Sequence, residues 1–162
     1  MPPFEAFFKR AVKDYMRKKF YILKADDTVA TAVKVMKDNN IGSVGVQFGS
    51  GPVGIITDRD IVMKVVYVSG DPAKVKLQDI AVRNPVTVQQ DASLEEAFRL
   101  MRDNGILRLI VLDGKNRPVG LLLERWVFAS FVSEVLADKR AEPQGWLDRY
   151  VRDVTDAALM ED

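Results

Sequence analysis

The chain repeats itself once, and this internal duplication constrains the fold more than any other feature of the sequence. A shift of 65 positions pairs Asp14 with Asp79, Asp26 with Asp91, Ala32 with Ala97, Met36 with Met101, Asp38 with Asp103, Asn39 with Asn104 and Ile41 with Ile106. One further residue in the next loop makes the shift 66, which pairs Pro52-Val53-Gly54 with Pro118-Val119-Gly120 and Arg59 with Arg125. Because two copies fit and no more, the pattern indicates a duplication rather than a solenoid.

Both copies predict the same order of elements, β-α-β-β-α. A β-rich piece (21–23 or 86–88) precedes a helix with the i, i+3, i+4, i+7 spacing of one buried stripe. The stripe residues are Val29, Ala32, Val33 and Met36 in the first copy, and Leu94, Ala97, Phe98 and Met101 in the second. Two apolar strands and a second helix follow. Since neither copy can bury a sizeable core alone, we expect an α/β (α+β) fold of two repeats packed face to face with pseudo-two-fold symmetry.

The expected organisation has five parts: an N-terminal helix (1–19), a first repeat (12–68), a linker (69–76), a second repeat (77–135) and a C-terminal helical extension (136–162). Apolar stripes mark both terminal segments. They consist of Phe4, Phe7, Phe8, Ala11, Val12, Tyr15 and Met16 before the first strand, and of Trp146, Leu147, Tyr150, Val151 and Val154 near the end. Such stripes either dock on the core or form a partner-binding face.

Charge and composition exclude several classes of function. Lys and Arg total 24 against 23 Asp and Glu, so the net charge of +1 argues against a nucleic-acid-binding protein. The chain has no cysteine and no histidine, which removes the usual thiol nucleophiles, general bases and transition-metal ligands. It also lacks a Gly-rich phosphate loop and any apolar run of about 18 to 20 residues that could span a bilayer. We therefore expect a cytoplasmic protein that binds no metal, no membrane and no nucleic acid.

Three groups of motifs resemble a tandem pair of CBS domains, the module named after cystathionine β-synthase, over roughly residues 12 to 135. They are the strand-to-helix entries Asp26-x-Thr28-Val29-x-x-Ala32 and Asp91-x-Ser93-Leu94-x-x-Ala97, the second strand at 104–113, and the third strand turning into a helix at 54–61. The resemblance implies a regulatory binding module, not an enzyme. Such pairs hold AMP, ADP, ATP or S-adenosylmethionine in clefts between the repeats, regulate an attached or associated protein, and associate into disc-shaped dimers.

By this resemblance, the segment 57–60 carries the ligand contacts: Thr57 binds the phosphate, Asp60 binds the ribose, and Asp58 lies between them. A carboxylate suits a ribose diol because it accepts from both hydroxyls in charge-assisted bonds. The alternative is that Thr57 caps a helix with Asp60 at its third position, which needs no ligand. The matching residues of the second repeat are Leu123 and Trp126, so the fold does not require a hydroxyl or an acid there. We therefore expect one adenosine site per chain, with the second cleft degenerate or occluded.

Arg108 is a second candidate, because family members often carry a basic residue there that reaches a phosphate; the alternative is a salt bridge to a nearby acid. By resemblance, the adenine ring would lie against Tyr21, Ile22, Ile41, Gly42, Ser43, Val44 and Ile55; residues of these types in such strands are more often plain core residues, and Gly42 could simply ease the entry to its strand. The basic run Lys9, Arg10, Lys13, Arg17, Lys18 and Lys19 is either a solvated face or a contact for phosphates or an acidic partner. Three hypotheses follow: a nucleotide sensor, an interaction module without a small ligand, and an enzyme, the last of which has no supporting motif.

Overall fold

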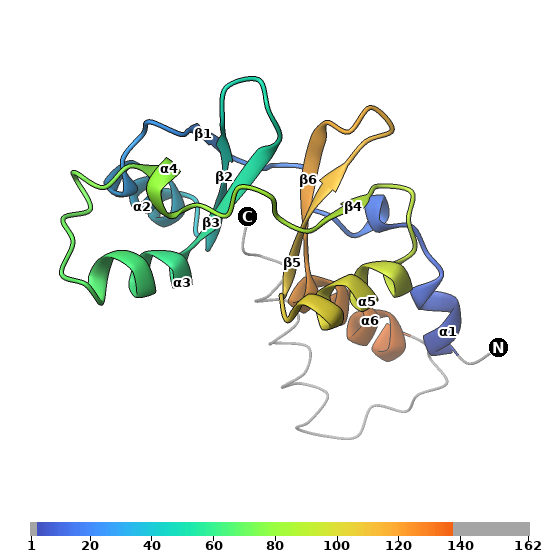
Figure 1. Cartoon of the computed structure of the whole chain (residues 1–162). Coiled ribbons are helices and arrows are strands. Elements are labelled where there is room, and N and C mark those ends of the chain that lie inside the picture. The colour runs from blue at the N-terminus through green and yellow to red at the C-terminus, as the bar shows by residue number, and fades with distance from the viewer. Residues whose placement is uncertain (1–2, 138–162) are drawn as a thin grey trace, which may run out of the picture. The chain divides into compact units, whose positions relative to one another are not determined.

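The computed structural model describes residues 3–137, which form two compact units (Figure 1). The repeat-1 unit consists of residues 20–85. The repeat-2 unit combines residues 3–19 with residues 86–137. The C-terminal helix expected around Trp146 lies outside the described residues.

The repeat-1 unit has a three-stranded sheet in the order β1-β2-β3, formed by Ile22–Lys24, Ser43–Gln47 and Val53–Thr57. Strands β1 and β2 are parallel and are joined by α2 (Val29–Asp38), whereas β2 and β3 form an antiparallel hairpin. Helix α3 (Asp58–Ile61) continues into the π-helical stretch η2 (Val62–Val66), and α4 (Leu77–Ile80) follows. Side chains from all of these helices and from β2 and β3 make the core; its buried members include Val29, Ala32, Met36, Val44, Val46, Ile56, Ile61, Val65, Leu77 and Ile80.

The repeat-2 unit has the same plan. Its sheet has the order β4-β5-β6, formed by Thr87–Gln89, Arg108–Leu112 and Pro118–Leu123. Helix α5 (Leu94–Asn104) joins the parallel strands β4 and β5, and α6 (Glu124–Ala137) follows β6. The predicted α+β class and the β-α-β-β-α order of both repeats are therefore confirmed.

The segment that precedes each repeat packs on the other repeat. Arg17 and Leu121 exchange two backbone hydrogen bonds of 2.9 Å, so the segment before repeat 1 pairs with β6 of repeat 2. In the same way Val82, from the segment before repeat 2, exchanges hydrogen bonds of 2.9 and 3.0 Å with Ile55 on β3. The compact units therefore differ from the repeats seen in the sequence, because each unit contains a leading segment from the other copy.

The N-terminal helix is shorter than its apolar stripe suggests, and the prediction of a helix over residues 1–19 is wrong. Helix α1 covers Pro3–Phe8, and a single 3₁₀ turn, η1, covers Val12–Asp14. The helix ends because the next backbone groups pair elsewhere: the Val12 amide donates to Ala92 O at 2.9 Å and the Leu94 amide donates to Arg10 O at 2.9 Å. A backbone group that bonds across the chain in this way is not available to a helix.

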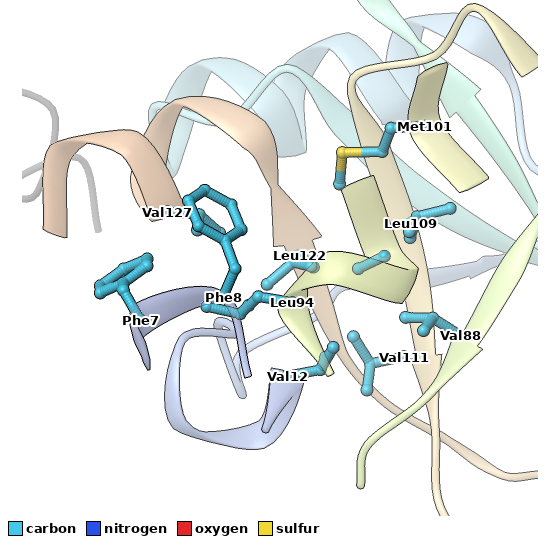
Figure 2. Packing of buried hydrophobic residues seen from close by; sticks show 11 residues of the cluster. Phe7, Phe8, Val12, Val88, Leu94, Met101, Leu109, Val111, Leu122 and Val127 are labelled. Carbon is cyan, nitrogen blue, oxygen red and sulfur yellow. The ribbon is translucent and has the colours of Figure 1, made fainter. Parts of the chain in front are cut away.

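The N-terminal stripe docks on the core of the repeat-2 unit, which is one of the two alternatives that the sequence left open. Figure 2 shows Phe7, Phe8 and Val12 packed with side chains from α5, β5, β6 and α6. All three are buried, and Tyr15 and Met16 pack against the same cluster. This burial anchors the segment before repeat 1 on the repeat-2 unit. The two backbone hydrogen bonds between Arg17 and Leu121 then fix the register of this segment against β6.

Candidate ligand-binding site

The junction of β3 and α3 is built by a reciprocal helix cap. The Thr57 hydroxyl oxygen accepts a hydrogen bond from the Asp60 amide at 3.2 Å, and the Thr57 amide donates to Asp60 Oδ2 at 2.9 Å. This arrangement satisfies amide groups that the first turn of a helix leaves without partners. The Asp58 amide donates to Gly42 O at 3.0 Å, which ties the start of α3 to the residue before β2. Asp58 itself is exposed, and its carboxylate accepts from the Arg59 amide at 2.8 Å.

The Asp60 carboxylate is held by its own chain on both oxygens. Oδ2 accepts from the Thr57 hydroxyl at 2.8 Å as well as from the Thr57 amide, and Oδ1 lies 2.9 Å from Lys64 Nζ. Its side chain is 17% exposed. Burial raises the pKa of Asp60, but the hydrogen bonds from Lys64 and Thr57 together outweigh burial and leave the pKa below its ordinary value. The group is therefore an ionised acceptor near neutral pH.

The observed geometry matches the second interpretation of the sequence, in which Thr57 and Asp60 cap α3 and need no ligand. A carboxylate has about four acceptor positions, and three are occupied here, which leaves one on Oδ1. Lys64 is a site residue that the sequence patterns did not single out, although i,i+4 spacing from an acid is typical of a helical ion pair. Its ammonium group also donates to Ile80 O at 2.7 Å.

One face of the repeat-1 sheet carries several of the predicted ligand residues. Ile22, Gly45 and Ile55 lie opposite one another across β1, β2 and β3, and Ser43 pairs with Thr57 in the same hairpin. Because side chains alternate along a strand, Ser43, Ile55 and Thr57 share the face opposite to the core. Ser43 is 4% exposed and Ile22 is 40% exposed.

Other predicted ligand residues lie on the core side. Val44 is fully buried among the core residues of the repeat-1 unit, so its side chain does not join the face that carries Ser43 and Ile55. Tyr21 and Ile41 are partly buried and pack against the same core. The Tyr21 hydroxyl donates to Asn39 Oδ1, which fixes its ring at the edge of α2. Gly42 contributes its carbonyl group to the α3 junction.

The equivalent junction in the repeat-2 unit has different chemistry. Leu123 and Trp126 replace the hydroxyl and the acid, and both are buried. The Arg17 guanidinium carbon lies 3.6 Å from the centroid of the Trp126 ring, within the range of a cation–π contact. Arg108 begins β5 opposite Leu123 and is half-buried. An indole stacked against a guanidinium therefore occupies the position where the first repeat has a carboxylate.

The described residues contain no group of three or more Asp, Glu, His or Cys side chains placed to hold a metal ion. Within residues 3–137, none of the helices has the length and apolar character needed to cross a membrane.

The duplicated fold defines a tandem pair of small α+β modules, and comparisons with known proteins place this pair in a family. The CBS domain model matches residues 12–67 and 77–125, so the chain belongs to the CBS domain family. An uncharacterized protein of Methanopyrus kandleri is 40% identical over 96 residues, which are 57% of this chain and 49% of that protein. The chain thus matches about half the length of this relative.

Solved structures share the fold. A conserved uncharacterized protein of Pyrococcus horikoshii is 28% identical with a TM-score of 0.67, and the match covers 85% of this chain and 98% of that one. A CBS domain pair described in complex with 5′-methylthioadenosine and S-adenosylmethionine has a TM-score of 0.67 at 24% identity, covering 76% of this chain and 97% of that one. At that identity the likeness concerns the fold.

Proposed function

We propose that the chain is a regulatory module that binds an adenosine nucleotide (AMP, ADP or ATP) and acts through a partner protein or through self-association. The observation that carries the proposal is the difference between the two junctions. Thr57 and Asp60 begin the helix in the first repeat, whereas Leu123 and Trp126 begin the equivalent helix in the second. Since the fold forms both helices, the polar pair is not a requirement of the fold.

In this proposal Asp60 accepts the two ribose hydroxyls and Thr57 contacts the phosphate. One acceptor position on Asp60 Oδ1 is free, and the first ribose hydroxyl donates to it. The second hydroxyl takes the position that Lys64 Nζ occupies now, so binding of the diol breaks the contact between Lys64 and Asp60. The Lys64 ammonium group, released from Asp60, then adds positive charge beside an anionic phosphate. Ile22, Ser43 and Ile55 are the side chains that we assign to the adenine ring, together with backbone groups at Gly42. Arg108 remains a predicted phosphate contact.

Family membership supports a binding role over catalysis, and a protein of the same fold is described with two adenosine compounds. We propose that the chain is not an enzyme. The cytoplasmic location remains a prediction from the sequence.

A second candidate function is a module for protein interaction that has no small ligand. The closed cap around Asp60 favours it, because Thr57 and Lys64 already engage both carboxylate oxygens without any ligand. The two functions differ in one measurable respect, which is whether adenosine compounds stabilise the folded chain.

Thermal unfolding of the full chain with AMP, ADP, ATP and S-adenosylmethionine separates them. A ligand at 100 times its dissociation constant adds about 2.7 kcal/mol of stability, which corresponds to a rise of about 5 to 10 °C in Tm. We expect this rise with at least one nucleotide and not with GMP, which serves as the matched control. A rise with S-adenosylmethionine alone would assign the site to that ligand. No rise with any compound at millimolar concentration would favour the interaction module.

We also propose that the chain forms a homodimer through the exposed apolar side chains of η2 and the turn after it. Val62, Met63, Val66, Tyr67 and Val68 are each more than half exposed. Contiguous apolar surface of this kind marks interaction sites in soluble proteins. A second copy is the occupant that membership of the CBS family favours, because such pairs associate with one another.

Val66→Glu is expected to weaken this dimer by about a hundredfold or more, because association would bury an unpaired carboxylate. Val66 is 64% exposed, so the monomer should fold normally. Sedimentation velocity over a range of concentrations measures the effect. The matched control is Leu107→Glu, since Leu107 is 62% exposed in the other unit and should tolerate the same charge. A dimer unaffected by Val66→Glu would exclude this surface.

A further inference from the structure

Lys64 bonds to two separate parts of the repeat-1 unit. Its ammonium group lies 2.9 Å from Asp60 Oδ1 and donates to Ile80 O at 2.7 Å. Ile80 is the last residue of α4, where carbonyl groups have no partner within the helix, so the ammonium group of Lys64 also caps α4. A second bond, which does not involve the carboxylate, therefore holds the cation beside Asp60.

The bond to Ile80 keeps the cation at the site when Asp60 changes partners. An ammonium group has three N–H donors, and within residues 3–137 two of them go to Asp60 and Ile80. When a ribose diol takes the place of Lys64 on Asp60, the bond to Ile80 remains and two donors need a new partner. The side chain of Lys64 is 42% exposed, so a group of the ligand can reach them.

We propose that Lys64 makes the site select phosphorylated adenosine compounds over uncharged ones, a proposal that rests on the function proposed above. An uncharged nucleoside separates the ion pair between Lys64 and Asp60 and offers Lys64 no anion in return. A nucleotide brings a phosphate group that accepts from the released donors, so new charge-assisted hydrogen bonds replace the one that was lost. Asp60 cannot make this distinction itself, because the ribose diol is the same in both compounds.

The other charges of the junction make a cation necessary for an anionic ligand. Asp58 and Asp60 both lie in the first turn of α3, and their carboxylates repel a phosphate group. The segment 57–64 also contains Arg59 and Lys64, so its net charge is 2 − 2 = 0. Without the charge of Lys64 the segment would be negative, and an uncharged ligand would be favoured over an anionic one.

The ratio of two dissociation constants, measured on the full chain, tests the role of Lys64. Isothermal titration calorimetry gives Kd for adenosine and for AMP, ADP and ATP, which share the base and the ribose and differ in the phosphates. We expect the best nucleotide to bind about 10 to 100 times more tightly than adenosine, as one charge-assisted hydrogen bond would give.

Substitutions of Lys64 should change this ratio in a way that a structural role would not. Lys64→Gln removes the charge and keeps a donor, and it should bring the two affinities within about threefold of each other, because the nucleotide loses its cation while adenosine no longer has to displace one. Lys64→Met should give the same ratio, since the charge and not the bond to Ile80 sets it. Lys64→Arg keeps the charge and should retain the preference for the nucleotide.

The matched control is Lys34→Gln on α2 of the same unit. Lys34 forms an i,i+4 ion pair with Asp38, as Lys64 does with Asp60, and its side chain is 75% exposed. This variant removes the same charge from the unit and should leave the ratio unchanged. If Lys64→Gln and Lys64→Met lower the affinities for adenosine and for the nucleotide equally, Lys64 only supports the fold. That result, or equal affinities in the unmodified chain, would overturn the role of Lys64 and leave the proposed function standing. If the full chain binds none of the four compounds, both proposals are wrong.

Discussion

Asp60→Asn is expected to weaken binding of the stabilising nucleotide by about a hundredfold or more. Each charge-assisted hydrogen bond contributes about 1.5 to 3 kcal/mol, and the carboxylate is proposed to accept two from the ribose. Asparagine has nearly the same shape, and its carbonyl oxygen can still accept the Thr57 amide that Asp60 Oδ2 accepts now. The helix cap should therefore persist while the affinity falls. Isothermal titration calorimetry with the nucleotide that raises Tm most measures the loss.

The matched control is Asp79→Asn in the same unit. Asp79 occupies the third position of α4, and its Oδ2 accepts the Lys76 amide at 3.3 Å, much as Asp60 accepts the amide of Thr57. Its substitution should cost at most about 1 kcal/mol of stability and leave the affinity unchanged. If Asp60→Asn binds at the strength of the unmodified chain, Asp60 does not contact the ribose. If both variants lose affinity equally, the loss reflects general destabilisation.

Gly120→Ala is expected to lower the free energy of unfolding by about 2 to 4 kcal/mol. A Cβ atom at position 120 would lie 2.4 Å from Arg17 O and 2.9 Å from Met16 Sδ. The methyl group would push the leading segment away from β6 and break the two backbone bonds between Arg17 and Leu121. Urea denaturation followed by circular dichroism measures the change. This expected loss is large compared with the free energy of unfolding of a typical domain, which is about 5 to 15 kcal/mol.

Gly114→Ala serves as the control. Gly114 lies in the turn between β5 and β6, and a Cβ atom there meets nothing within 4 Å, so the substitution should stay within about 0.5 kcal/mol. Gly54→Ala tests the same contact in the other unit, because its Cβ would lie 2.6 Å from Val82 O. We expect Gly54→Ala to destabilise and Gly114→Ala not to. A neutral Gly120→Ala would mean that the leading segment does not pair with β6 in solution.

The elements themselves were predictable because local patterns encode them. The predicted stripe of α2 is confirmed at Val29, Ala32 and Met36, which are buried in the core of the repeat-1 unit. The prediction is wrong for Val33, which is 42% exposed because it lies at the edge of the buried face of the helix. Thr28 and Ser93 each come directly before a helix that carries a stripe of apolar residues. The hydroxyl oxygen of each caps that helix by accepting a hydrogen bond from the backbone amide three residues later. The residue types at the β3–α3 junction were also visible, since comparison of the two repeats singles out Thr57 and Asp60.

The duplication, the α+β class and the contrast between an acidic and an indole-bearing junction were all readable before any fold was known, because they depend on residue identity and short spacing. The pairing of Arg17 with Leu121 and of Val82 with Ile55 became visible with the folded chain alone, since backbone groups carry no sequence code and bond to whatever strand edge the fold brings beside them. Long-range backbone bonds of another pair of segments, 10–12 with 92–94, end α1 at Phe8, although the apolar stripe continues beyond it. The ion pair between Lys64 and Asp60 also became visible with the fold, because the direction of a side chain depends on the helical turn that carries it.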